Sequence, residues 1–315
     1  MEISVIISTY NGASKLPVIL ESLENQSKKD FELVIVVDGS TDETMDVLKD
    51  WQKRFANLRV IYRENGGRAA VRNTGAKNAT GELLLFFDDD LVVDRKCVEQ
   101  HLQYHDATDH KNIFLGEVID AATETQDNRA FLLYKKHLAA KWNKGLYRAD
   151  RKITDNSFYG DSYIAGANFS LTKKLYEFLG GLDESLNRVE DFEFGIRAKA
   201  QNIKIVLGYA YAAVIHRDGD NDFKKWVKKV RITEENFAIA YAKDPVKFRL
   251  LAPLRASVKN VFIKMVLRSF ANHVSYNFMV SDSRLKNILP KALLYRVYDI
   301  IVISNGRFYP DKVAL

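Results

Sequence analysis

The chain has 315 residues, 47% of them hydrophobic and 28% charged, which excludes a disordered or fibrous protein and allows one large domain or two smaller ones. Its single cysteine, Cys97, excludes an intramolecular disulfide and a cysteine metal cluster, and we expect it to be a small buried residue in a helix. The formal net charge of +6 is uneven, because residues 221–315 carry 18 basic and 7 acidic side chains (+11) and residues 1–220 carry 29 and 34 (−5).

The first ninety residues alternate between predicted strands and helices. Apolar runs predict strands at Ile3–Ser8, Phe31–Val37, Leu58–Tyr62 and Leu83–Phe87. Helical spacing predicts helices at Ser14–Gln26, from a capping box at Ser40–Glu43 to about Phe55, and near Ala69–Asn78. This alternation indicates an α/β fold, with a doubly wound, mostly parallel sheet flanked by helices and a ligand site at the carboxyl ends of its strands.

Beyond Asp106 the predicted strands and helices no longer alternate regularly. We expect strands at Ile113–Val118, Ile164–Leu171, Ile203–Leu207 and Ala212–Ile215, and helices near Arg129–Lys144, up to Leu179, and from Glu190 to Ala200. After Asp220 the chain is predicted to be largely helical. We therefore predict a main domain at residues 1–220 and a basic helical extension at 221–315.

Three consecutive carboxylates, Asp88, Asp89 and Asp90, follow the strand predicted at Leu83–Phe87. Adjacent like charges repel one another unless a cation or solvent compensates them. A hard divalent ion that also bridges to a diphosphate would be a natural compensator. The alternative is a solvated acidic turn.

Other polar residues follow the first strands or lie on the helix between them. Asp38 directly follows the second strand, where it could accept hydrogen bonds from a nucleobase or ribose, or simply form a turn. Tyr10 offers a ring for base stacking. Arg68 and Arg72 share a helix face and could contact phosphate or form surface ion pairs.

Two further candidates lie later in the chain. Glu190 and Asp191 open a predicted helix, where acids favour the helix dipole, but a carboxylate held in a pocket there could also act as a general base. His216 ends an apolar strand and is either a structural residue or a metal ligand. The chain lacks a Gly-x-x-x-x-Gly-Lys phosphate loop, a Gly-x-Ser-x-Gly elbow and a His-Glu-x-x-His zinc helix.

Taken together, these segments resemble the family 2 glycosyltransferases of the GT-A fold over roughly residues 1–220. The resemblance rests on short motifs in the family's order: Val5–Asn11, Asp38–Asp42, Ala70–Gly75, Gly81–Asp90, Gly166–Ser170, Gly180–Glu184 and Glu190-Asp191. It implies an inverting transferase that moves a sugar from a nucleoside-diphosphate sugar, most often UDP-linked, to an acceptor hydroxyl with the help of Mg²⁺ or Mn²⁺.

The resemblance also implies roles for individual residues. The nucleotide would be bound by Ser8, Tyr10, Asp38, Arg72, Asp88 and Asp89; the metal by Asp90 and His216; and the donor and acceptor sugars by Gly166, Asn168 and Glu190. Asp191 would be the catalytic base. A sugar-phosphate nucleotidyltransferase and a non-catalytic nucleotide-sugar binding protein remain alternatives.

The distribution of charge along the chain indicates which binding partners to expect. A basic extension on an acidic main domain argues against nucleic-acid binding, since the basic surface should then lie on the working domain. We expect a glycan or lipid-linked acceptor and a cytoplasmic protein without a signal peptide. Lys224, Lys225, Lys228 and Lys229 flank Trp226, a cluster suited to an anionic membrane surface. The rival interpretation buries the extension against the main domain or a second subunit.

Overall fold

The computed structural model describes residues 2–120, 133–135, 137–138, 158–160, 163–164, 166–217, 223–251, 261–272, 274–275 and 289–308. The chain divides into two compact units, one made of Met1–Ala121 and Gly145–Asp218, the other of Ala122–Lys144 and Gly219–Leu315. The second unit thus takes in residues 122–144 as well as the predicted extension. Of the helix predicted near Arg129–Lys144, only residues 133–135 and 137–138 lie within the described residues, and these are helical.

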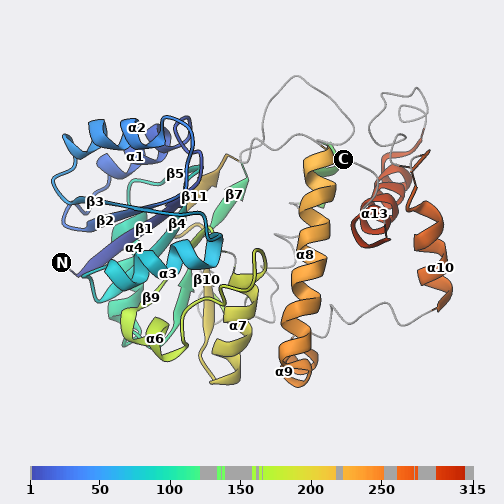
Figure 1. Ribbon diagram of the computed structural model, residues 1–315. Helices are drawn as coiled ribbons and strands as arrows, with labels where there is room; N and C mark the ends of the chain where they lie inside the picture. The colour runs from blue at the N-terminus through green and yellow to red at the C-terminus, as the bar shows by residue number, and fades with distance from the viewer. Residues whose placement is uncertain are drawn as a thin grey trace. The chain divides into compact units, whose positions relative to one another are not determined.

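An eight-stranded sheet forms the centre of the first unit (Figure 1). Its strands lie in the order β3 (Leu58–Arg63), β2 (Glu32–Asp38), β1 (Ile3–Thr9), β4 (Leu83–Asp88), β9 (Asn168–Thr172), β6 (Ile113–Leu115), β10 (Ile205–Gly208) and β8 (Phe158–Tyr159). The first four are parallel neighbours, as the alternation predicted. β9 runs antiparallel to β4 and β6, and β8 to β10, so the sheet is mixed but mostly parallel.

A second, three-stranded sheet consists of β5 (Leu91–Val93), β11 (Val214–His216) and β7 (Val118–Asp120). β11 is antiparallel to β5 and parallel to β7. The single strand predicted at Ile113–Val118 is therefore wrong, because the chain leaves one sheet after β6 and joins the other at β7. Gly116 makes this crossing: a Cβ there would lie 2.2 Å from the Ala212 carbonyl oxygen.

Helices cover both faces of the large sheet, because its buried strands are apolar on both sides. Side chains of α1 (Leu16–Glu24), α2 (Thr44–Gln52) and α4 (Cys97–Ala107) pack in one hydrophobic cluster with alternate residues of β1 and β2. Side chains of α3 (Arg68–Asn78), α6 (Lys173–Phe178) and α7 (Glu190–Ala200) pack with the intervening residues. Cys97 is fully buried in α4, as predicted.

The capping box predicted at Ser40–Glu43 does not form. Helix α2 begins at Thr44, the side chain of its N-cap residue Glu43 makes no capping hydrogen bond, and the Thr44 amide donates to Asp42 Oδ1 at 3.2 Å. The Ser40 hydroxyl instead accepts a hydrogen bond from the Asn11 amide at 2.9 Å, and the Asp42 carboxylate accepts one from the Ala13 amide at 3.1 Å. These residues join the β2–α2 loop to the β1–α1 loop at the carboxyl edge of the sheet.

The described part of the second unit is helical, as predicted for the extension. It contains α8 (Phe223–Lys243), α9 (Pro245–Leu251), α10 (Val261–Phe270) and α13 (Lys291–Phe308), and α13 packs against both α8 and α10. Tyr134, Val227 and Tyr298 contribute to its core, and the Tyr134 hydroxyl donates a hydrogen bond to Asp299 Oδ1 at 2.6 Å. Among the described residues, no helix has the length and apolar character needed to span a membrane.

Candidate active site

The carboxyl edge of the large sheet gathers several of the predicted site residues. Ser8 and Asp88 are register neighbours because β1 and β4 are parallel. The strand β5 directly follows the acidic triplet and pairs antiparallel with β11, so that His216 lies opposite Leu91. The Arg217 amide also donates a hydrogen bond to the Asp90 carbonyl at 2.9 Å. The second sheet thereby returns His216 to the acidic triplet from more than a hundred residues away.

The three acids of the triplet point to different partners. Asp88 accepts a hydrogen bond from Arg72 Nη2 at 2.6 Å, and Asp90 Oδ1 lies 3.2 Å from His216 Nε2. Asp89 accepts a hydrogen bond from Thr9 Oγ1 at 2.7 Å and pairs with Lys15 at 3.2 Å. Burial raises the pKa of Asp89, although Lys15 and Thr9 oppose this. The structure therefore groups Asp88 with Asp90 and directs the predicted nucleotide ligand Asp89 to the β1–α1 loop.

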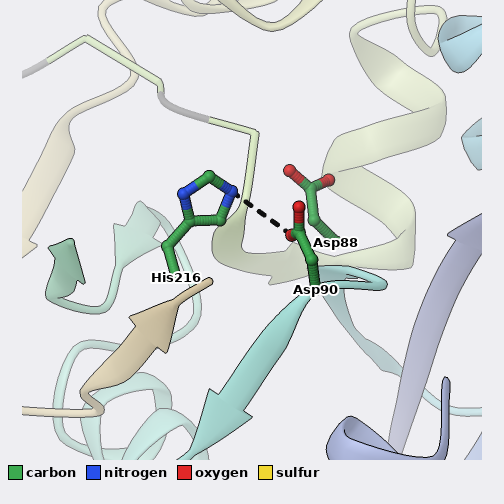
Figure 2. A group of neighbouring side chains, drawn as sticks. All are labelled: Asp88, Asp90 and His216. Atoms are coloured by element: carbon green, nitrogen blue, oxygen red, sulfur yellow. Dashed lines mark ion pairs between the residues drawn. The ribbon is translucent and has the colours of Figure 1, made fainter. Parts of the chain in front are cut away.

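Asp88, Asp90 and His216 form a group that could hold a metal ion (Figure 2). One ligand atom of each lies within 4.8 Å of the others. Asp90 Oδ1 is buried, and among the described residues it makes an ion pair with His216 Nε2 and no hydrogen bond beside it. A buried carboxylate oxygen in that state is costly unless a cation compensates it. Carboxylate and imidazole ligands suit Mn²⁺ and carboxylates suit Mg²⁺, so these residues fit the expected ion.

Arg72 is buried between two acids. Its side chain is 4% exposed, and its Nη1 donates to Glu190 Oε1 at 2.7 Å while Nη2 donates to Asp88. Burial disfavours its charged form, but Asp88, Glu190 and Asp191 raise its pKa above the ordinary value, so the guanidinium remains charged. Asp88 has a lowered pKa in return: burial raises it, but Arg72, Arg68 and His216 outweigh burial. Arg72 thus joins the metal group to the start of α7.

Asp191, the predicted base, lies in the first turn of α7. Its Oδ2 accepts a hydrogen bond from the Gly166 amide and its Oδ1 one from the Phe192 amide, each at 2.7 Å. Burial and then the negative charge of Glu190 raise the pKa of Asp191 to about 6, against the opposing effects of Arg72 and the two amides. A carboxylate that titrates near neutral pH is suited to accept a proton from a substrate hydroxyl.

The backbone around Asp191 is constrained on two sides. A Cβ on Gly166 would lie 3.1 Å from Asp191 Oδ2 and 3.2 Å from Arg72 Nη2, so a side chain at this position would displace both groups. Val189, just before the helix, has a φ of 63°, which strains a β-branched residue by about 1–3 kcal/mol. Such strain is retained when the surrounding structure fixes the backbone. The backbone conformation at Val189 sets the orientation in which α7 presents Glu190 and Asp191.

Two residues of the predicted nucleotide site lie at the ends of β1 and β2. Asp38 is buried and accepts hydrogen bonds from the Gly66 and Gly67 amides, each at 2.9 Å. It therefore fixes the loop that leads into α3. Tyr10 is 50% exposed. An exposed ring offers a face on which a planar base can stack.

Asn168, predicted to contact a sugar, has its side chain in the core instead of facing the carboxylate group. Its Oδ1 lies 2.9 Å from His101 Nε2, and its Nδ2 donates to the Ala212 carbonyl at 2.7 Å. Ser170 Oγ continues this buried network, 2.7 Å from His101 Nδ1 and 2.8 Å from His105 Nε2. Burial lowers the pKa of His101 to about 3 and that of His105 to about 4, so both rings are neutral at physiological pH.

A family model described as "Glycosyl transferase family 2" matches residues 4–176, more than half of the chain. The chain belongs to this family. The resemblance inferred from the sequence motifs is thereby confirmed, and the match covers the strands and helices that carry Ser8, Asp38, Arg72 and the acidic triplet.

Curated relatives of this family 2 member share the same region. It is 29% identical over 218 residues to "Putative glycosyltransferase EpsH" of Bacillus subtilis. The aligned region covers 68% of this chain and 61% of that protein. It is 28% identical over 227 residues to "Poly(ribitol-phosphate) beta-glucosyltransferase" of Bacillus spizizenii, which covers 70% of the chain and 33% of that protein. The chain therefore matches less than two thirds of the length of either relative.

Solved structures confirm the expected GT-A fold. The mannosyltransferase PcManGT from Pyrobaculum calidifontis, in complex with GDP-Man and Mn²⁺, aligns with a TM-score of 0.66 at 16% identity, over 96% of this chain and 86% of that one. S. aureus TarS 1-349 in complex with UDP aligns with a TM-score of 0.53 at 19% identity, over 97% and 89%. At these identities the similarity establishes the fold of the family 2 member and nothing finer.

Sequence reasoning missed one residue that organises the site of this family 2 member. Asn73 Oδ1 accepts hydrogen bonds from the Leu182 amide at 2.9 Å and from the Tyr176 hydroxyl at 2.6 Å. Its Nδ2 donates to the Leu182 carbonyl at 2.9 Å and to Glu184 Oε1 at 2.8 Å. Asn73 therefore holds the loop that leads into α7 against α3. Its place beside Arg72 in a motif was the available signal, but a single sequence does not reveal such long-range partners.

Proposed function

We propose that the chain is a glycosyltransferase that moves a sugar from a nucleoside-diphosphate sugar, UDP-linked, to a hydroxyl of a glycan or lipid-linked acceptor with inversion. The observation that carries this proposal is a series of charged side chains in contact at the carboxyl edge of the sheet. It begins at the Asp88, Asp90 and His216 group and passes through Arg72 to Glu190, beside Asp191. The candidate metal ligands and the candidate base are thus linked through Arg72, which supports assigning them to one site.

Each of these side chains has a role in this proposal. Asp88, Asp90 and His216 would hold Mn²⁺ or Mg²⁺, which as a Lewis acid offsets the charge that develops on a departing diphosphate. Arg72 remains charged and supplies a fixed positive group next to Asp88. Asp38 and Tyr10 would bind the base and ribose, and Ser8 would line the same pocket.

Asp191 would remove the acceptor proton. Its two amide hydrogen bonds hold the carboxylate in one orientation, and its pKa of about 6 leaves it mostly ionised at neutral pH but still basic enough to accept a proton. The acceptor oxygen would then attack the anomeric carbon opposite the diphosphate, and the bond to the diphosphate oxygen would break in the same displacement. Such a step inverts the anomeric configuration and needs no nucleophilic carboxylate.

A thermal-shift screen tests the donor and metal parts of the proposal. UDP, GDP and the corresponding nucleotide sugars are compared with and without Mn²⁺. Ligand at about 100 times its dissociation constant stabilises the folded state by about 2.7 kcal/mol, or roughly 5 °C in melting temperature. We expect this shift for UDP and UDP-sugars only when Mn²⁺ is present.

Two variants from the same segment sharpen the screen. Asp90→Asn should abolish the Mn²⁺-dependent shift because it removes a predicted ligand. Asp94→Asn, four residues further on, removes an exposed carboxylate outside the metal group and should leave the shift intact. A UDP shift that is equal with and without Mn²⁺, or equal in both variants, would remove the metal from the proposal.

A further inference from the structure

Helix α10 of the second unit has an exposed apolar face. Phe262 is 66% exposed and Met265 is 60% exposed, and their spacing of three places them on the same side of the helix. Leu267, on the opposite side, is only 8% exposed, and α10 packs against α13 (Figure 1). Val274, just beyond the helix, is 80% exposed. The helix therefore has one buried side and one apolar side that faces outward.

The sequence around this helix is strongly basic. Residues 245–281, which include α9 and α10, contain no aspartate or glutamate and have six basic side chains: Lys247, Arg249, Arg255, Lys259, Lys264 and Arg268. Arg268 is exposed on α10 itself, near the Met265 side of the helix. Exposed apolar side chains together with a one-signed positive charge are typical of helices that lie in the headgroup region of an anionic membrane.

We propose that the exposed face of α10 binds the surface of an anionic lipid bilayer, with Phe262 and Met265 entering the headgroup region and the basic residues attracted to the lipid phosphates. Charge decides between this partner and a second copy of the chain. Residues 221–315 carry a net charge of +11, so two copies that met through α10 would bring like charges together. An anionic bilayer complements both the charge and the apolar side chains.

The surface proposed on α10 differs from the basic-aromatic cluster around Trp226 that the sequence suggested as a membrane contact. The Trp226 ring of α8 packs against the core of the second unit, with Lys135 Nζ 5.4 Å and Lys229 Nζ 5.7 Å from its centre. A ring held in this way contributes to the core of the unit. The large apolar side chains of α10 have more exposed surface to offer to lipid.

Co-sedimentation of the full chain with vesicles tests the inference independently of any transferase activity. Neutral phosphatidylcholine vesicles are compared with vesicles that contain about 30% phosphatidylglycerol, at low and at high salt. We expect binding to the anionic vesicles only and its loss at high salt, because screening weakens the attraction. Binding that is equal for both vesicle types, or absent from both, would overturn the proposal.

Matched variants then locate the surface. Met265→Ser with Phe262→Ser should lower the partition coefficient by about tenfold or more, and Arg268→Ala should lower it by about fivefold. Met265→Trp should raise it. Phe178→Ser, which changes a side chain that is 68% exposed in the first unit, serves as the control and should have no effect.

Two further readouts keep these variants interpretable. The melting temperature of each variant should match the parent, since all four positions are exposed. Sedimentation velocity measures self-association: a dimer of the parent chain that Met265→Ser converts to monomer would overturn the proposal in favour of a second copy. Equal vesicle binding by the α10 variants and the parent would also overturn it.

Discussion

Replacement of Glu190 by glutamine tests how the site sets the basicity of Asp191. Glu190 is 3% exposed and accepts a hydrogen bond from Arg72 at 2.7 Å, and its negative charge is the second largest cause of the raised pKa of Asp191. Glu190→Gln removes this charge but keeps an oxygen that Arg72 can bind. The pKa of Asp191 should therefore fall, because its ionised form is no longer repelled by a neighbouring acid.

The size of the effect follows from the same contacts. A neighbouring charge changes a carboxyl pKa by about one to three pH units, and Arg72 partly offsets Glu190, so we expect the lower end of this range. If Asp191 acts as the proposed base it must be ionised to work, and its pKa of about 6 then places the acidic limb of the kcat profile near pH 6. In Glu190→Gln this limb should move to about pH 5. The ratio of the rate at pH 5 to the rate at pH 7.5 should then rise about fivefold.

Steady-state rates between pH 4.5 and 8, with donor and acceptor saturating, give the midpoint of the limb. Glu193→Gln is the matched control, since Glu193 lies one turn further along α7 and pairs with Arg197 at 2.7 Å. This control should leave the midpoint unchanged. We expect Glu190→Gln to lower the free energy of unfolding by about 1–3 kcal/mol. Glu190→Ala should lower it more, because the buried charge of Arg72 then loses a hydrogen-bond partner as well. If the acidic limb of Glu190→Gln stays at the parent value, Glu190 does not set the basicity of Asp191.

Three further substitutions test other parts of the structure. Gly166→Ala should lower kcat at least tenfold, because its Cβ would lie 3.1 Å from Asp191 Oδ2 and 3.2 Å from Arg72 Nη2; an unchanged kcat would contradict the positioning role of Gly166. Asp38→Ala should weaken UDP binding by roughly 1–3 kcal/mol in calorimetry, and an unchanged affinity would remove Asp38 from the nucleotide site. His105 is neutral when folded, with a pKa of about 4 against 6.5 for an unperturbed histidine, so the unfolded state binds more protons and stability falls as the pH drops below 6.5. His105→Gln should abolish roughly 2 kcal/mol of the stability lost in urea unfolding between pH 7.5 and pH 5, and a pH dependence equal to that of the parent would contradict this.

Much of the first unit could be predicted because its signals are local. The apolar runs of β1, β2 and β4 have no other stable place than a sheet covered on both faces, and the polar residues after them necessarily meet at one edge. Helix α7 spans Glu190–Ala200, the range that its apolar periodicity indicated. In such segments, local preference and tertiary packing favour the same structure.

The sequence failed to predict features of the structure that depend on a partner distant along the chain. Glu190 is the helix-terminal acid that the sequence indicated, but its buried pair with Arg72, 118 residues away in sequence, was not predicted. Asn168 belonged to a motif that implied a sugar contact, yet His101 and the Ala212 carbonyl engage its side chain in the core. The strand predicted at Ile113–Val118 divides because Gly116 must pass close to the backbone of another segment. Periodicity along one chain contains no information about such partners.

The measurement that tests the central claim most directly is the release of UDP from UDP-sugars by the full chain, with Mn²⁺ and a mixed extract of glycan and lipid-linked acceptors. The parent chain should release UDP, and excess EDTA should stop the reaction. Asp191→Asn should lower the rate by about 10²–10⁴-fold while the affinity for UDP barely changes. Release at the parent rate by Asp191→Asn, or full turnover in EDTA, would contradict the proposed site. Binding of UDP without any release would indicate the non-catalytic alternative.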